Sequence, residues 1–286
     1  MVMGHEATGR VADAGQGVDR GLVGRRVVLQ PFVYCGACPQ CIAGTENLCA
    51  RRHFHGVDRD GAMALALNVP AANVEAIPDT LADLGAVLVE PLAVALHAVS
   101  VAGAMAGRIV FVAGCGPIGL LTGFVARRAG ARTVVGTDLQ PRRRAAALAL
   151  GFDAAAHPAE TASLRAAAGA SRPRFADVAF DAVGVEATLA QAVELLAPAG
   201  TLVALGGWQA ARIDLRGIVG NELALRGSFN YRRDEFERAI AVVSETPTLG
   251  ERIVTDAVPM DEGAAAFARL AAGTHTGLKI VLEPPG

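Results

Sequence analysis

The sequence Gly114-Cys115-Gly116-Pro117-Ile118-Gly119 constrains the fold of this chain more than any other stretch. A short apolar run, residues 108–113, precedes it and is rich in β-branched residues, which predicts a buried strand. The segment Pro117–Ala129 begins with proline, which suits the first turn of a helix. A second strand-like run, Thr133–Thr137, ends at Asp138. Strand, glycine turn, helix, strand and acid in this order predict a βαβ unit that binds a dinucleotide.

The residue types of this turn suit a diphosphate. Gly114 permits a tight turn, Gly116 lets backbone N–H groups approach a pyrophosphate at the helix N-terminus, and Gly119 permits close packing of helix and strand. We expect the coenzyme to contact these three glycines and the two residues between Gly116 and Gly119, which are Pro117 and Ile118.

Asp138 favours NAD over NADP as the coenzyme. It lies 19 residues after Gly119, where its carboxylate can accept hydrogen bonds from a ribose 2′-hydroxyl and would repel a 2′-phosphate. Three arginines, residues 142–144, follow closely and argue in the opposite direction. We predict NAD.

A membrane-spanning helix is the rival interpretation of the same region. Residues 109–126 contain no charged side chain and are flanked by arginines, which satisfies a crude rule for a membrane span. Four glycines and a proline fall inside this window, and helical segments recur at intervals after it. We therefore predict no membrane span.

Four cysteines are crowded into 15 residues. Cys35, Cys38, Cys41 and Cys49 have the spacing C-x2-C-x2-C-x7-C, and short glycine- and proline-containing loops between them let four thiolates converge on one zinc. Buried free thiols are the alternative. A zinc with four protein ligands is closed to substrate, so this site should stabilise a loop. The nearby His53 and His55 are interpreted as loop residues.

Composition excludes several classes of protein. The chain has 286 residues, of which 52% are hydrophobic, and its net charge is −2, so we expect a globular protein of two domains without affinity for nucleic acid. Residues 1–6 lack the cationic start and apolar core of a signal peptide, and cysteines clustered for a metal indicate a reducing compartment. We expect a cytoplasmic location. Lys279 is the only lysine, which by itself indicates no function.

Two further patterns contain candidate metal ligands. His5 and Glu6 stand together before a strand-like run and are a plausible metal-site pair, although a frayed, solvated terminus is the interpretation that the local sequence favours. Glu90 lies in the apolar run 86–92, where an unpaired carboxylate is costly to bury and therefore needs a cation or a metal. The alternative is a partly exposed acid in a first helical turn beside Pro91.

Helical and strand-like segments alternate through the rest of the chain. Gly184 and Gly206 each follow a predicted strand, and glycines at the carboxyl ends of parallel strands line the crevice that holds a dinucleotide. Plain turn chemistry is an equal alternative for Gly206. We expect helices over residues 84–101 (interrupted at Glu90-Pro91), 141–150, 186–197, 234–244 and 261–272, and strands over 61–77, 178–181, 201–205, 223–228, 253–258 and 278–282.

Together these features resemble the zinc-containing medium-chain dehydrogenase family, and most of all its polyol, butanediol and threonine dehydrogenase branch. The resemblance covers nearly the whole chain. The matching segments are Gly4-His5-Glu6, the four-cysteine lobe, Val89–His97, Gly114–Gly119 with Asp138, and Gly227-Ser228-Phe229.

The resemblance implies an α/β fold with two domains. A doubly wound parallel Rossmann sheet binds the coenzyme, and a β-rich GroES-like catalytic domain, incomplete at its N-terminus, carries the structural zinc lobe. The implied boundaries are residues 1–92 for the catalytic domain with the lobe at 35–49, 93–252 for the Rossmann domain, and 253–286 for the return to the catalytic domain. Because members of the family form dimers or tetramers, we expect a homodimer or a homotetramer.

The resemblance also implies roles for single residues. His5 and Glu90 match ligands of a catalytic zinc, Glu6 matches the carboxylate beside that metal, and Arg143 matches a residue that flanks the adenosine. This context favours a metal role for His5 over a frayed terminus. The family's opening strands, which bring a first cysteine ligand, do not precede Met1, so three protein ligands require that Glu6 binds directly. We interpret Met1 as an internal or misassigned start.

We therefore predict an NAD-dependent, zinc-assisted dehydrogenase of an alcohol or polyol. Zinc acts on the substrate hydroxyl as a Lewis acid, and a hydride passes from the carbinol carbon to NAD. The alternative is a truncated, catalytically silent NAD-binding protein that holds only the structural zinc. A third interpretation, a four-cysteine nucleic-acid module, disagrees with the charge of the chain.

Overall fold

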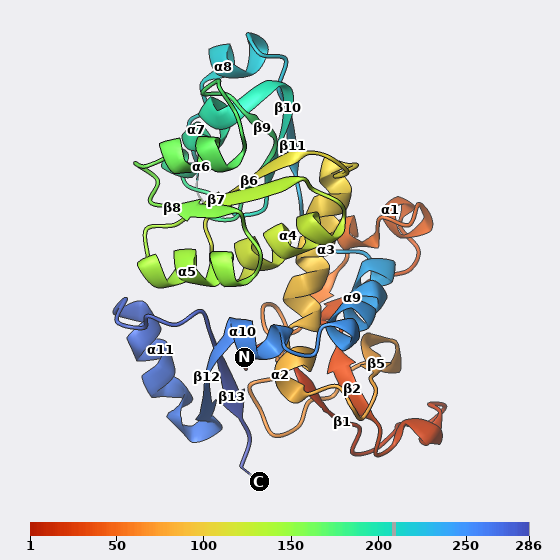
Figure 1. Ribbon diagram of the computed structural model, residues 1–286. Coiled ribbons are helices and arrows are strands. Elements are labelled where there is room, and N and C mark those ends of the chain that lie inside the picture. Colours follow the sequence, from red (N-terminus) through yellow and green to blue (C-terminus); the bar gives the residue numbers. More distant parts are fainter. Residues whose placement is uncertain (208–209, 286) are drawn as a thin grey trace. The chain divides into compact units, whose positions relative to one another are not determined.

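The computed structural model describes residues 1–207 and 210–285 (Figure 1). The chain forms two compact units: unit 1 is Met1–Ala93 with Asn230–Gly286, and unit 2 is Val94–Phe229. The chain thus returns to unit 1 at Asn230, whereas the sequence placed the return at residue 253. The reason is that helices α9 (Arg233–Glu245) and α10 (Leu249–Ile253) pack against α2 (Asp83–Ala86) of unit 1.

Unit 2 is built on one sheet of six parallel strands. The strand order is β11-β10-β9-β6-β7-β8, in which the chain starts at the centre, winds to one edge and then winds to the other. This is the order of the doubly wound dinucleotide-binding fold. The strands are β6 (Ile109–Ala113), β7 (Thr133–Thr137), β8 (Ala154–Ala156), β9 (Ala176–Asp181), β10 (Leu196–Ala204) and β11 (Ala224–Gly227).

Helices cover both faces of this sheet. Figure 1 shows α4 and α5 on one face and α6 and α7 on the other. The central strands β6 and β7 are buried along their whole length, as expected for strands covered on both faces. The helices of unit 2 are α4 (Pro117–Arg128), α5 (Pro141–Ala149), α6 (Ala162–Ala167), α7 (Glu186–Leu195) and α8 (Leu215–Val219), together with the greater part of α3 (Val89–Ala102).

Unit 1 is β-rich and irregular. Strands β1 (Thr8–Arg10), β2 (Arg26–Leu29) and β5 (Val74–Ala76) form an antiparallel sheet, β3 (Phe32–Val33) pairs with β4 (His53–Phe54), and β12 (Val254–Pro259) pairs in parallel with β13 (Lys279–Glu283). The helices are α1 (Pro39–Ile42), α2, the start of α3, α9, α10 and α11 (Gly263–Ala271), with short 3-10 turns at Arg20–Leu22, Glu46–Leu48, Ala71–Asn73 and Met260–Glu262.

The structure confirms the predicted fold class and corrects some elements. The predicted strand over residues 61–77 is wrong except at β5, because residues 61–63 form backbone hydrogen bonds with Val2, Met3 and Gly4 and leave a loop behind them. The predicted break at Glu90-Pro91 falls earlier, between α2 and α3, so that Glu90 lies in the first turn of α3.

The uncharged window at residues 109–126 is not a membrane helix. It divides into strand β6 and helix α4. Another stretch, Asp83–Ala102, is long and apolar enough to cross a membrane, but 78% of it is buried inside the protein. Such burial is typical of a core helix.

Candidate active site

The glycine turn between β6 and α4 has the geometry that a diphosphate requires. Gly114 has φ +88°, which favours glycine, and a Cβ on Gly119 would lie 1.8 Å from the carbonyl oxygen of Gly114. By contrast, a Cβ on Gly116 would meet no atom within 4 Å. The turn is therefore closed on the protein side and open at Gly116, the N-cap of α4, where N–H groups can face an anion.

Asp138 lies directly after β7 and is 7% exposed. Its Oδ2 accepts a hydrogen bond from the backbone N–H of Cys115 at 2.9 Å, and its Oδ1 accepts one from Gln140 N–H at 2.8 Å. The guanidinium of Arg143 lies 3.7 Å from Oδ2. These contacts fix the carboxylate beside the glycine turn, and each oxygen keeps a lone pair for a further donor such as a ribose hydroxyl.

A pocket of about 390 Å³ lies at the carboxyl ends of the central strands of unit 2. It is found where the strand order reverses between β6 and β9, which is where ligands bind in such sheets. The predicted contact residues Ile118, Gly184 and Gly206 are among its lining residues, which are Val94, Ile118, Ala182, Val183, Gly184, Val185, Leu205, Gly206 and Gly207.

The buried carboxylate of Asp181 shapes this pocket, although the sequence did not single it out. Its Oδ1 accepts hydrogen bonds from the N–H groups of Val183 and Gly184, both at 3.0 Å, and its Oδ2 accepts one from the Thr188 hydroxyl at 3.2 Å. The loop then passes so close to the next strand end that a Cβ on Gly184 would lie 2.2 Å from the nitrogen of Gly207. An Asp followed three residues later by Gly was the only available signal.

A second group of candidate residues lies in unit 1. Ligand atoms of His5, Glu6 and Glu90 all lie within 4.8 Å of one another. Burial raises the pKa of Glu90 to about 8, and the nearby Tyr231 hydroxyl opposes that shift. Burial, and secondly the charge of Lys279, lower the pKa of His5, which favours the neutral imidazole that a metal needs.

Lys279 lies beside the candidate ligands, a position that the sequence did not indicate. Its ammonium group forms an ion pair with Glu6, and burial lowers the pKa of Lys279 to about 8. The two residues are 273 positions apart, so no local pattern connects them. Glu6 is therefore held between a cation and the other two candidate ligands.

The residues of this group fit a zinc ion. Imidazole nitrogens and carboxylate oxygens both bind zinc, and three protein ligands leave the fourth position open, as at catalytic zinc sites. Glu90 is only 5% exposed, and a cation would stabilise its ionised form, which burial alone disfavours.

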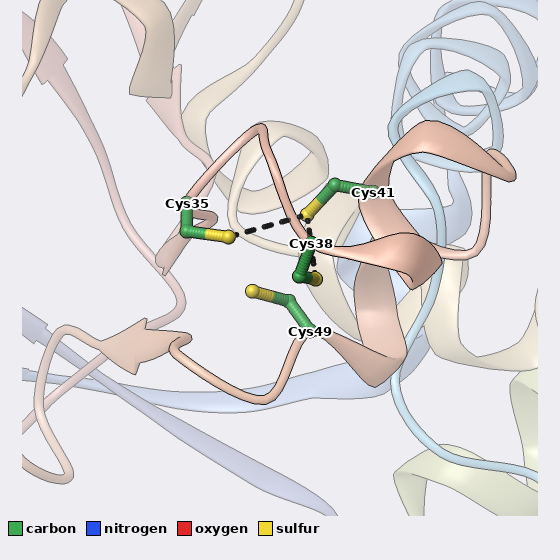
Figure 2. A group of neighbouring side chains, drawn as sticks. All are labelled: Cys35, Cys38, Cys41 and Cys49. Atoms are coloured by element: carbon green, nitrogen blue, oxygen red, sulfur yellow. Dashed lines mark hydrogen bonds between the residues drawn. The ribbon is translucent and has the colours of Figure 1, made fainter.

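The four cysteines form a separate cluster in unit 1. Figure 2 shows their side chains converging, with 3.9 Å between the sulfur atoms of Cys35 and Cys41 and 3.5 Å between those of Cys38 and Cys41. Donation from the backbone N–H of Ala37 lowers the pKa of Cys35 to about 6. Ligand atoms of all four, Cys49 included, lie within 4.8 Å of one another, which fits a closed tetrahedral zinc site.

Two family models match the chain. Residues 1–79 match the alcohol dehydrogenase GroES-like domain, and residues 117–245 match the zinc-binding dehydrogenase domain.

Dehydrogenases and reductases of known name are similar to this chain over nearly its whole length. D-xylulose reductase A of Aspergillus niger is 32% identical over 288 residues, which are 99% of this chain and 80% of that protein. The structure of a zinc-binding dehydrogenase of Sinorhizobium meliloti bound to NADP is 34% identical, with a TM-score of 0.89 over 99% of this chain and 83% of that one. The 2R,3R-butanediol dehydrogenase of Bacillus subtilis is 31% identical, with a TM-score of 0.87 over 99% and 80%.

These findings define the class of protein as a two-domain, zinc-binding oxidoreductase with a GroES-like and a Rossmann-like part. The chain belongs to the zinc-containing medium-chain alcohol dehydrogenase family. It is accordingly a zinc- and nicotinamide-dependent enzyme that acts on a small alcohol or polyol.

Proposed function

We propose that this chain oxidises a polyol with NAD, and that His5, Glu6 and Glu90 hold the catalytic zinc. The observation that carries the proposal is the convergence of these three ligand atoms around a buried carboxyl group. A buried carboxyl group with this neighbourhood is costly unless a cation compensates it, so a structural role alone does not explain Glu90.

Each group of residues has a part in the proposed reaction. When bound, zinc supplies a Lewis acid that lowers the pKa of a substrate hydroxyl, and NAD supplies the acceptor for the hydride. His5 and Glu90 hold the metal, and Glu6, whose charge is shared with Lys279, completes the donor set. The glycine turn binds the coenzyme diphosphate, and the pocket beside Gly184 holds the nicotinamide half and keeps water away from it.

NAD is the proposed coenzyme because Asp138 presents a fixed carboxylate where the adenosine ribose binds in this fold. The relative from Sinorhizobium meliloti is bound to NADP, so the choice needs a direct test. We expect kcat/KM for NAD to exceed that for NADP at least tenfold. Asp138→Ser should reverse the preference, because it removes the repulsive charge beside Arg143. Equal use of both coenzymes by the unaltered protein would refute this assignment.

A polyol is the proposed substrate because the similar proteins include a D-xylulose reductase and a butanediol dehydrogenase. The test measures NADH formation with xylitol, other pentitols, 2R,3R-butanediol and matched mono-alcohols. The proposal predicts higher kcat/KM for compounds with two adjacent hydroxyls. A protein that oxidises only mono-alcohols would contradict the polyol assignment and leave the dehydrogenase assignment intact.

We also propose that the protein associates with copies of itself and is cytoplasmic. Within the described residues, β11 pairs with β10 on one side only, and Leu225 at this edge and Val219 on α8 are 51% and 75% exposed. Such an edge is suited to pairing with a second copy. Analytical ultracentrifugation tests this, and a monomer at micromolar concentration would contradict it. The free cysteines of the metal cluster suit a reducing compartment.

A further inference from the structure

Tyr231 occupies a fixed position in unit 1. The residue before it, Asn230, has φ +52°, a left-handed conformation that asparagine tolerates better than most residues. The Tyr231 ring is fully buried and stacks on Phe236 with 5.5 Å between ring centroids, while Phe32 meets it edge-on at 6.2 Å. The backbone conformation at Asn230 and the two aromatic neighbours together fix the orientation of the Tyr231 side chain.

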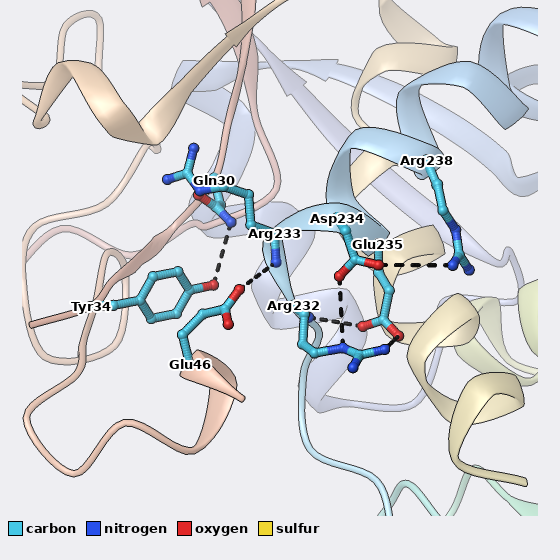
Figure 3. Close-up of polar contacts among 8 residues, drawn as sticks. All are labelled: Gln30, Tyr34, Glu46, Arg232, Arg233, Asp234, Glu235 and Arg238. Carbon is cyan, nitrogen blue, oxygen red and sulfur yellow. Dashed lines mark hydrogen bonds and ion pairs between the residues drawn. The ribbon is translucent and has the colours of Figure 1, made fainter. Parts of the chain in front are cut away.

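The segment that carries Tyr231 is fastened on its C-terminal side. The N–H of Arg232 donates to Glu235 Oε2, and the N–H of Arg233 donates to Glu46 Oε1, both at 2.8 Å. Figure 3 shows these contacts at the start of α9, with Glu46 reaching over from the four-cysteine lobe. The backbone that follows Tyr231 is therefore fixed by hydrogen bonds of the next two residues.

This hydroxyl is a buried polar atom that has no hydrogen-bond partner of good geometry. The carboxyl group that reaches it is Glu90, since hydrogen bonding between these two side chains acts on the pKa of both. A buried hydroxyl left short of a partner is costly and uncommon in folded proteins.

We propose that Tyr231 is a positioning residue that donates a hydrogen bond to Glu90 and so directs the other carboxylate oxygen toward His5 and Glu6. A carboxylate with both oxygens free can rotate, whereas one oxygen fixed by a rigid donor sets the direction of the second. Donors of this kind orient metal ligands and raise metal affinity. The inference rests on the proposed function, since it assumes a zinc ion at these three residues.

The test is the rate at which the purified protein loses zinc to a chromogenic chelator. Tyr231→Phe removes the hydroxyl and keeps the ring. The matched control is Tyr34→Phe, because Tyr34 is the only other tyrosine and its hydroxyl instead accepts from Gln30 Nε2 at 3.3 Å. Glu90→Gln identifies which kinetic phase belongs to the candidate site, and the four-cysteine zinc serves as an internal reference.

We expect two zinc ions per chain, with Tyr231→Phe losing the one at Glu90 at least tenfold faster than the unaltered protein and Tyr34→Phe. The cysteine-bound zinc should leave at the same rate in all of them. If Tyr231→Phe keeps both rates unchanged, the inference about Tyr231 is wrong and the zinc site stands. If the unaltered protein holds only the cysteine-bound zinc, the proposed function fails instead.

A second measurement does not depend on how well Tyr231→Phe folds. Because the chain has two tyrosines, selective ¹³Cζ labelling gives two NMR signals, and Tyr34→Phe assigns them. Adding zinc to protein stripped by a chelator should move the Tyr231 signal in step with occupation of the Glu90 site. A Tyr231 signal that stays in place while that site fills would overturn the inference.

Discussion

Gly116→Ala should weaken coenzyme binding and leave the stability of the fold nearly unchanged. Gly116 has φ −71° and ψ 180°, which alanine adopts freely, and an added Cβ would meet no protein atom within 4 Å. Replacing a glycine at such φ and ψ stabilises a protein by about 0.4–1 kcal/mol, because the unfolded chain loses freedom, but Gly116 is the N-cap of α4, where glycine is preferred to alanine, and this preference offsets the gain.

The same methyl group would stand where the diphosphate must approach. An N–H group binds a phosphate oxygen at about 2.9 Å, whereas a carbon atom needs about 3.5 Å or more. Loss of one hydrogen bond to a charged group costs about 1.5–3 kcal/mol, which corresponds to a roughly 10- to 150-fold weaker NAD affinity.

Two assays separate these effects. Urea unfolding without coenzyme measures the free energy of unfolding, and calorimetric titration with NADH measures affinity. Gly15→Ala is the control, because its Cβ also meets nothing within 4 Å and it lies far along the chain from the turn. Gly119→Ala should lose both stability and binding, since its Cβ would lie 1.8 Å from a carbonyl oxygen. Unchanged NADH affinity in Gly116→Ala would refute the placement of the diphosphate.

Three further perturbations follow from the structure. Burial raises the pKa of Glu90 to about 8, so between pH 4.5 and 8 the zinc-free folded state binds one more proton than the unfolded state. Its stability should therefore fall as pH rises through that window, and Glu90→Gln should flatten this dependence in urea unfolding; an identical slope in both proteins would contradict it. Asp181→Ala removes the acceptor of three hydrogen bonds, so it should lower the free energy of unfolding by about 1–3 kcal/mol and weaken NADH binding; unchanged NADH affinity in calorimetry would contradict a role of Asp181 in shaping the pocket loop. Cys49→Ser should release the lobe zinc and lower the melting temperature while the zinc at Glu90 is kept, and metal analysis that finds both zinc ions lost would contradict two independent sites.

The coenzyme-binding unit could be predicted from the sequence because its determinants are local. Strand, glycine turn, helix and Asp138 lie within about 30 consecutive residues, and each has one physical task. The four cysteines are likewise close in sequence, and their convergence needs only short loops. The regular alternation of strands and helices then predicts a parallel sheet covered by helices, which the structure has, but it does not give the strand order.

The surroundings of Glu90 could not be predicted in this way. Lys279 and Tyr231 approach the candidate ligands from segments far along the chain, and neither has a sequence pattern that gives its partner. The predicted strand over 61–77 failed for the same reason, because its first residues bond to the backbone of Val2, Met3 and Gly4. Long-range packing decided these positions, and local preference did not.

X-ray diffraction recorded on both sides of the zinc absorption edge tests the central claim most directly. The account predicts two anomalous peaks per chain, one among the sulfur atoms of the four cysteines and one between His5, Glu6 and Glu90. Crystals of Glu90→Gln should keep the first peak and lose most of the second. A single peak, at the cysteines alone, in crystals grown with excess zinc would contradict the proposed catalytic site.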